Sequence, residues 1–222
     1  MRAALAIARK DLLVELRTKE SVPAMALFAV TTFVIFHFGL DRDRLEGELA
    51  AGVLWVTLLF AAILGINRLF VAERDEGGFD AIRLAPVDGT ALLAAKAAAL
   101  VVYLVVLEVI AVPIFAIFFL DSGAALAPLA GVLALTDLGL AATGVLVSSI
   151  AANSRARDLL VPLILLPLLV PVMIGAANAA EPLLEAGGPS YAGIGKWLAF
   201  LALYDMTFVA VGFAVYDFLL ED

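Results

Sequence analysis

Long apolar runs alternate with short polar segments along most of the chain. A helix of roughly 20 residues crosses about 30 Å of hydrocarbon. Six apolar runs reach that length: residues 22–40, 49–71, 97–120, 126–152, 159–180 and 197–220. Within each run the apolar residues are continuous rather than alternating, which excludes the strands of a membrane β-barrel. The pattern therefore predicts an all-α membrane protein with six transmembrane helices.

The composition places the whole chain in a membrane. Of its 222 residues, 64% are hydrophobic and only 16% are charged, and the mean hydropathy is +1.08. A soluble domain of this size cannot hide so much apolar surface in its core. Neither a repeat nor a change in composition divides the sequence, so we expect residues 1–222 to form a single transmembrane domain in a lipid bilayer.

The basic residues predict the orientation of the spans. Eleven of the 14 lysines and arginines lie before the first span or in the second and fourth connections, and three lie in the alternate connections. Loops rich in lysine and arginine stay on the cytoplasmic side of a membrane, and carboxylates contribute little to this rule. We therefore expect a multi-pass protein with both termini in the cytoplasm, despite its net charge of −8.

The first 20 residues form a basic, partly amphipathic segment. Apolar residues such as Leu12 and Leu16 make a partial stripe among the charges. Such a helix before a first span usually lies in the plane of the membrane surface. We expect an interfacial elbow helix over residues 1–20, with Glu15 and Lys19 as an i, i+4 ion pair.

Charges of both signs crowd together in one interior segment, residues 73–96, which cannot lie in lipid. Gly77 and Gly78 interrupt any helix that continues from the second span, and Pro86 ends the short helical stretch that follows. We expect residues 73–86 to form a short helix across the cytoplasmic face, where a soluble partner could bind. An ordinary solvated loop is the alternative.

Three carboxylates interrupt apolar spans: Glu108 in the third, Asp137 in the fourth and Asp205 in the sixth. A carboxylate inside a bilayer costs about 3 kcal/mol on insertion scales, so each should face a protein interior, a cavity or a partner. They are candidates for an intramembrane function. The alternatives are a neutral, hydrogen-bonded role between helices, or a position from which the carboxylate reaches water.

Other residues concern packing. Gly139, Thr143, Gly144 and Ser148 recur at short intervals in the fourth span and favour close contact between helices. Three prolines in the fifth span predict bends, because each removes a backbone donor. The connection over residues 178–196 contains glycines, prolines and few apolar residues, which suits a re-entrant or interfacial segment on the outer side.

Several catalytic signatures are missing from the sequence. It contains no GxxxxGK[ST] phosphate-binding loop, no HExxH motif and no cysteine. We therefore expect no ATP-binding site, no metal site and no enzymatic activity of its own. Uphill transport would draw its energy from a separate ATPase at the cytoplasmic face, or from an ion gradient acting through the buried carboxylates.

The sequence ERDEGGFD at residues 73–80, followed by Leu84 and Pro86, resembles the signature after the second span of ABC-2-type exporter permeases. In that superfamily the segment is the coupling helix that docks into the ATPase subunit. Gly78 stands where the signature usually has threonine. The resemblance assigns the ATPase contact to five residues: Glu73, Arg74, Gly77, Asp80 and Arg83.

Two further stretches narrow the resemblance. RKDLLVELRTKE at residues 9–20 and RDLLVPLILLPLLVPVMI at residues 157–174 are similar to the start and the fifth span of the CcmB family, the permeases of the cytochrome c biogenesis haem exporter. The family implies a permease of the bacterial inner membrane that pairs with the ATPase CcmA and the membrane proteins CcmC and CcmD. That complex frees the haem-loaded chaperone CcmE, and it involves no nucleic acid.

Residues that could ligate haem are sparse. Axial haem ligands are side chains such as histidine, methionine and cysteine, and this chain offers His37, with Met25, Met173 and Met206 scattered along it. We therefore expect partners to bind haem and ATP, and this chain to bind no cofactor directly. The alternatives are an ABC-2 permease for a polysaccharide, lipid or drug, and an ion-driven carrier that uses the three carboxylates.

Overall fold

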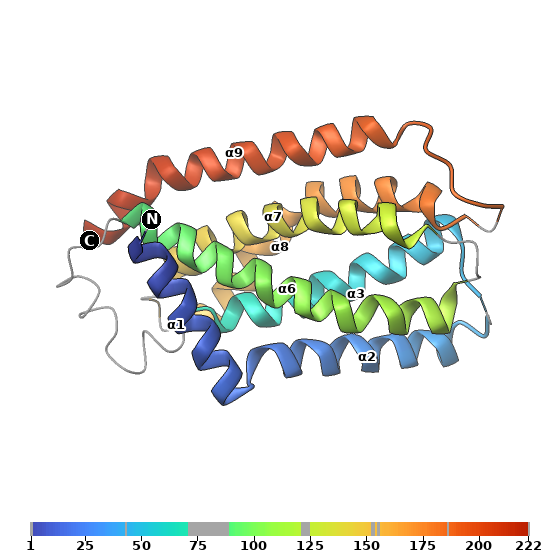
Figure 1. Cartoon of the computed structure of the whole chain (residues 1–222), viewed down its shortest axis with the longest axis horizontal. Coiled ribbons are helices and arrows are strands. Elements are labelled where there is room, and N and C mark those ends of the chain that lie inside the picture. The colour runs from blue at the N-terminus through green and yellow to red at the C-terminus, as the bar shows by residue number, and fades with distance from the viewer. Residues whose placement is uncertain are drawn as a thin grey trace.

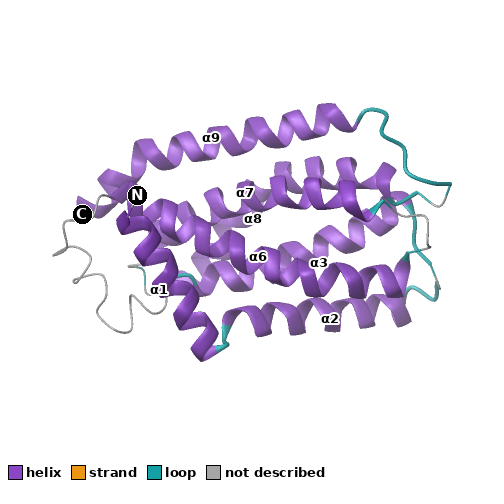
Figure 2. Cartoon of the chain, in the orientation of Figure 1, coloured by secondary structure: helices purple, strands orange, loops and turns teal. Residues whose placement is uncertain are grey.

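The computed structural model describes residues 2–42, 44–70, 89–120, 125–151, 154, 156–185 and 187–221. In these ranges the chain is helical apart from short connections, and none of it forms a strand (Figure 2). The elements are α1 (Arg2–Thr18), α2 (Ser21–Gly39), α3 (Gly47–Arg68), α6 (Gly89–Phe119), α7 (Leu126–Ala151), α8 (Arg157–Ala180), the short 3-10 helix η1 (Glu181–Leu183) and α9 (Ile194–Glu221).

Six helices are long and apolar enough to cross a membrane: α2, α3, α6, α7, α8 with η1, and α9. The predicted all-α membrane fold is thereby confirmed. The main difference is at α6, which begins at Gly89 rather than at the predicted residue 97. With 31 residues, α6 is about 46 Å long and extends beyond a 30 Å hydrocarbon layer. The prediction missed these first turns because it ended the apolar run at the charge of Lys96.

The helices form an elongated bundle with both termini at one end, which we call the terminal end (Figure 1). α3 ends and α6 begins at the terminal end. The helices α3 and α7 are the most buried of the six and form the centre. α2 covers one side of this centre and α9 covers the other (Figure 1). Each span therefore contacts the central pair, while α2 and α9 leave broad apolar faces for lipid or partners.

α1 crosses the terminal end at an angle to the bundle (Figure 1), and its role as an interfacial elbow helix stays a prediction. Leu5 and Leu16 are 73% and 69% exposed, an apolar surface suited to the membrane interface. The expected pair between Glu15 and Lys19 is wrong. The carboxylate of Glu15 instead accepts hydrogen bonds from the backbone amides of Ser21 at 3.0 Å and Val22 at 2.8 Å, and so caps the start of α2.

The small residues of α7 allow close packing, as predicted. A methyl group on Gly144 would lie 2.8 Å from the Cδ1 atom of Ile66 in α3, so any larger residue there would force the Ile66 side chain to shift. The hydroxyl of Ser148 donates to the carbonyl of Ile66 at 3.2 Å. α8 continues through all three of its prolines, from Arg157 to Ala180. The centre of the bundle is thus built from close contacts between helix backbones.

Backbone hydrogen bonds join the connections at the opposite end of the bundle. The amide of Leu45 donates to Phe119 at 2.8 Å, and that of Gly47 donates to Leu184 at 3.0 Å. Gly47 has φ +51, a conformation that glycine adopts without strain. Leu184 is 2% exposed, so part of the connection over residues 178–196 packs against the bundle. A re-entrant or interfacial role for that connection stays a prediction.

Candidate functional site

The five residues expected to contact an ATPase lie outside the described residues, and their role stays a prediction. They are Glu73, Arg74, Gly77, Asp80 and Arg83. The structure does describe the framework on both sides of them: the last turn of α3, followed by Leu69 and Phe70, and the first turns of α6 from Gly89. Both helix ends are therefore places where movement of the intervening segment can reach the bundle.

Two buried cations hold the end of α3. The ammonium of Lys96 in α6 donates to the carbonyl of Leu69 at 3.1 Å, and the guanidinium of Arg157 in α8 donates to the carbonyl of Asn67. The last carbonyls of a helix have no intrahelical partner, and the helix dipole places partial negative charge on them. Both cations are therefore favourably placed, and they attach the end of α3 to α6 and α8.

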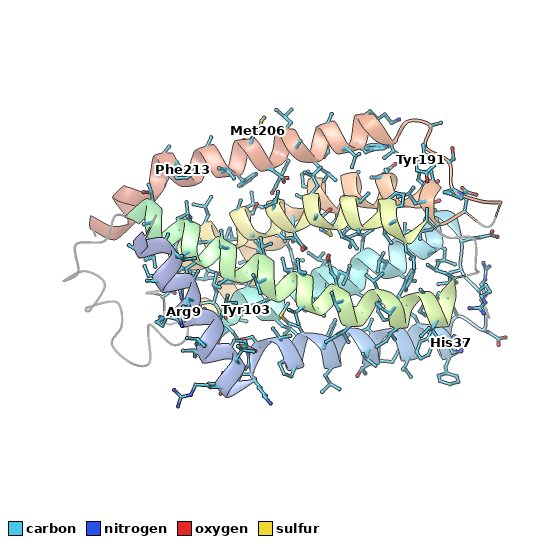
Figure 3. The ribbon with its side chains drawn as sticks, viewed as in Figure 1. Arg9, His37, Tyr103, Tyr191, Met206 and Phe213 are labelled. Carbon is cyan, nitrogen blue, oxygen red and sulfur yellow. The ribbon has the colours of Figure 1, made fainter. Side chains whose placement is uncertain are left out.

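Lys96 also binds the elbow helix. Its side chain is 2% exposed, and its Nζ atom lies 2.9 Å from the Oδ2 atom of Asp11 in α1, whose side chain is 9% exposed. The same ammonium lies 5.1 Å from the ring centre of Phe70. Tyr103, further along α6 and directed toward α1 (Figure 3), donates its hydroxyl to the Asp11 carbonyl at 3.3 Å. Lys96 therefore links three segments: α1, α6 and the end of α3.

We call Asp11, Lys96, Ser148 and Arg157 the α3 joint, because all four act at or beside the last turn of α3. A buried charge without its partner costs several kcal/mol, so the ion pair and the carbonyl contacts should persist while the protein is folded. Through the joint, the end of α3 is bonded to α6, α7 and α8 directly and to α1 through Lys96. Displacement of this end must therefore move or break those contacts.

Sequence reasoning missed the α3 joint, although it left a signal. Lys96 lies in the run ALLAAKAAAL, where every neighbour is alanine or leucine. A single charge in such a run requires a buried partner or a route to water. Its partner, Asp11, is 85 residues earlier in the chain, so the pattern reveals the need for a partner but not its identity.

The three intramembrane carboxylates lie at one common depth. Glu108, Asp137 and Asp205 are each eleven residues from the end of their helix that is opposite the terminal end. At 1.5 Å per residue that is about 16 Å, near the middle of a 30 Å hydrocarbon layer. An intramembrane function for the three carboxylates stays a prediction.

The structure brings two of these carboxylates together and leaves the third separate. The carboxyl groups of Glu108 in α6 and Asp137 in α7 lie within hydrogen-bonding reach of each other, and a bond between them requires a proton on one of the two groups. The Oδ2 atom of Asp137 has no hydrogen-bond partner among the described residues. Asp205 of α9 instead points at α7, where its Oδ1 atom would lie 2.6 Å from a methyl group on Gly139. Neither oxygen of Asp205 has a hydrogen-bond partner among the described residues.

The residue beside Asp205 does not satisfy it. Tyr204 donates its hydroxyl to the carbonyl of Leu168 in α8 at 2.9 Å, and its oxygen lies 3.1 Å from the hydroxyl of Thr143 in α7. These two bonds tie α7, α8 and α9 together. They also leave the Tyr204 hydroxyl no second proton to donate to a carboxylate.

The sole histidine packs among aromatic rings. His37 lies on α2 at the end opposite the termini (Figure 3). Its ring stacks on Phe118 at 5.2 Å and meets the edge of Phe119 at 5.9 Å. Met206 is 62% exposed and projects away from the bundle on α9 (Figure 3), whereas Met25 is fully buried on α2. Among the described residues, His37, Met25 and Met206 therefore lie on different parts of the bundle.

Comparison with known proteins assigns the chain to a family. The profile of the CcmB protein family matches residues 2–219. Three curated relatives are each named Heme exporter protein B. That of Bradyrhizobium diazoefficiens is 31% identical over 187 residues, 82% of each chain. That of Rhodobacter capsulatus is 30% identical over 149 residues, which cover 67% of this chain and 68% of the relative. That of Pseudomonas aeruginosa is 27% identical over 204 residues, which cover 91% of this chain and 90% of the relative. Since the profile spans nearly the whole sequence, this chain belongs to the CcmB protein family.

Proposed function

We propose that this chain is the membrane permease subunit of a haem exporter that serves cytochrome c maturation, and that a separate ATPase subunit drives it. The name shared by the relatives supports haem, over a polysaccharide, lipid or drug, as the cargo of the complex. The α3 joint carries the coupling part of the proposal, because it bonds four helices to the end of α3 from which the ATPase-contact segment extends.

Coupling proceeds through the two helix ends that flank residues 73–86. The ATPase binds this segment and changes its position during the ATP-hydrolysis cycle. The contact residues are Glu73, Arg74, Gly77, Asp80 and Arg83. The end of α3 follows, and its bonds to Lys96 and Arg157 carry the displacement into α6 and α8. α1 moves with them, because Asp11 is paired to the same lysine. ATP hydrolysis in one subunit thus becomes helix movement in another.

Haem itself is held by partner subunits in this proposal. The separation of His37 from the methionines supports this, since axial ligation of one haem needs ligands that face a common iron. A CcmA-like ATPase, CcmC-like and CcmD-like membrane subunits and the CcmE-like haem chaperone are the proposed partners. The complex lies in the bacterial inner membrane with the terminal end in the cytoplasm, where most of the basic residues gather.

The test is charge reversal in the ATPase-contact segment. Arg74→Glu combined with Arg83→Glu should reduce both the recovery of the ATPase with this chain and its stimulated ATP hydrolysis, while leaving the spans folded. The matched control is Arg42→Glu with Lys196→Glu, which reverses two charges at the opposite end, one in the connection after α2 and one in the first turn of α9. If the first variant binds and stimulates the ATPase as well as the control does, the assignment of residues 73–86 is wrong.

A further inference from the structure

An apolar groove opens between α7 and α9 in the half of the bundle opposite the terminal end. Its volume is about 480 Å³, and its lining includes Pro128, Gly131 and Leu138 of α7 with Ile194 and Leu198 of α9. Tyr191, labelled in Figure 3, also lines the groove. Leu138 is 49% exposed there, so the groove is open to the outside of the bundle and can receive an apolar segment.

The α7 wall of the groove is built for close approach by a helix. Gly131 and Ala134 line the groove, and Ala127 and Ala130 continue the run of exposed small residues beside it at helical spacing along α7. A methyl group on Gly131 would meet no atom within 4 Å. Small residues at this spacing let two helix backbones approach each other within a membrane. The opposite face of the same stretch is buried in the bundle, as at Leu129, so the small residues are left for another helix.

A buried carboxylate lies beyond the inner end of the groove. On α9, Ile194, Leu198 and Asp205 follow the spacing of one helix face, and Asp205 packs on Gly139, the residue after the groove-lining Leu138. Asp205 is only 7% exposed, and both of its oxygens lack a hydrogen-bond partner among the described residues. A carboxylate at this depth needs a donor or a cation. Along α7, the residue that Asp205 packs on directly follows the groove-lining Leu138, so the groove ends next to this carboxylate.

We propose that this groove receives a transmembrane helix of a second, different membrane subunit, and that a lysine or arginine of that helix pairs with Asp205 near the middle of the bilayer. The groove, the small-residue wall and the unpartnered carboxylate each point to this occupant. A lipid acyl chain would fill the apolar part but has no proton to donate to Asp205. Haem carries carboxylates of its own, so its charge would oppose that of Asp205.

The inference rests on the proposed function only in requiring that this chain works within a complex of several membrane subunits. It does not depend on which residues contact the ATPase. The occupant is defined by its chemistry: an apolar helix with small residues on its contact face and one long basic side chain about 16 Å from the membrane boundary opposite the terminal end. Lysine and arginine are both long enough to extend along the groove wall to a recessed carboxylate.

Photo-crosslinking in native membranes tests the inference. A photoreactive residue at Leu138, 49% exposed in the groove, should form an adduct with a transmembrane span that contains a lysine or arginine. The control position is Leu163, 70% exposed on α8. Asp205→Lys should lower the yield of the adduct by about tenfold, and changing the basic residue of the captured helix to aspartate should restore it.

A second variant keeps the test decisive if Asp205→Lys does not fold. Gly131→Leu adds bulk in open space and should block the groove without disturbing the core, so it too should lower the adduct at Leu138 while the adduct at Leu163 stays unchanged. Adducts with lipid alone, or with a second copy of this chain, would overturn the inference. It would also be overturned if neither Asp205→Lys nor Gly131→Leu changed the yield of the adduct at Leu138. Recovery of the ATPase is measured in the same samples. Its presence without the adduct refutes this inference alone, and its absence from the wild-type sample refutes the proposed function.

Discussion

The ion pair between Lys96 and Asp11 should account for much of the stability of the terminal end. Lys96→Met keeps most of the side-chain volume but removes the charge, and leaves a carboxylate that is 9% exposed facing no ammonium from α6. Both side chains are more than nine-tenths buried, so the pair belongs to the class in which removal of one partner costs about 3–5 kcal/mol. We expect a decrease of that size in the free energy of unfolding.

A double-mutant cycle separates the pair from its surroundings. Asp11→Leu should be costly by itself, because it removes the carboxylate that lies 2.9 Å from the buried ammonium of Lys96. The variant that combines Lys96→Met with Asp11→Leu removes both charges of this buried ion pair. We expect it to recover about 2–3 kcal/mol relative to the sum of the single effects.

Unfolding in mixed detergent micelles, followed by tryptophan fluorescence, would measure these values. Trp55 is 3% exposed on α3 and reports on the core, and Trp197→Phe removes the second tryptophan. The control is Lys10→Met, because Lys10 lies 3.0 Å from the same carboxyl group but is 51% exposed, so its loss should cost less than about 1 kcal/mol. Single costs below about 1 kcal/mol, or additivity within about 0.5 kcal/mol, would refute the role given to the pair.

Three further predictions follow from individual contacts. Gly139→Ala should lower the free energy of unfolding by about 1–3 kcal/mol, because the new methyl group would lie 2.6 Å from Asp205. The matched change Gly131→Ala meets open space and should be neutral or slightly stabilising, so equal losses in the two variants would contradict this reasoning. Glu15→Ala should cost about 1 kcal/mol through loss of the α2 cap, and Glu15→Gln, which keeps an oxygen acceptor, should lose less in the same unfolding assay. In reconstituted vesicles, Glu108→Gln should leave the ATP-dependent activity of the complex in place. If the wild-type chain instead shows flux driven by an ion gradient and Glu108→Gln abolishes that flux, the ion-driven carrier is favoured.

The six spans could be predicted from the sequence because the need for about 20 apolar residues per crossing is local. The close packing of α7 was also visible, since its small residues repeat at helical spacing. The sequence pattern predicted the start of this span too late, at residue 97, because a charged residue such as Lys96 usually lies in water. In the structure that charge is inside the protein, neutralised by a residue of α1. Tertiary contact thus overrode the local pattern.

Which helices become neighbours could not be predicted, and the candidate sites depend on it. Asp11 and Lys96 meet only because α1 folds back across α6, and Asp205 meets Gly139 only because α9 packs on α7. The sequence analysis gave Glu108, Asp137 and Asp205 the same interpretation, as candidates for an intramembrane function. The structure separates a pair within hydrogen-bonding reach of each other from a carboxylate without a described partner, a distinction that depends on helix rotation within the bundle.

Identification of the proteins that copurify with this chain tests the central claim most directly. The chain would be tagged, extracted from its native membrane in mild detergent, and its companions identified by mass spectrometry. The account predicts an ABC ATPase together with cytochrome c maturation proteins, in amounts comparable to the chain itself. Recovery of the folded chain with no ATPase would contradict the account, and an ATPase accompanied only by cell-envelope or drug-resistance proteins would contradict the haem assignment.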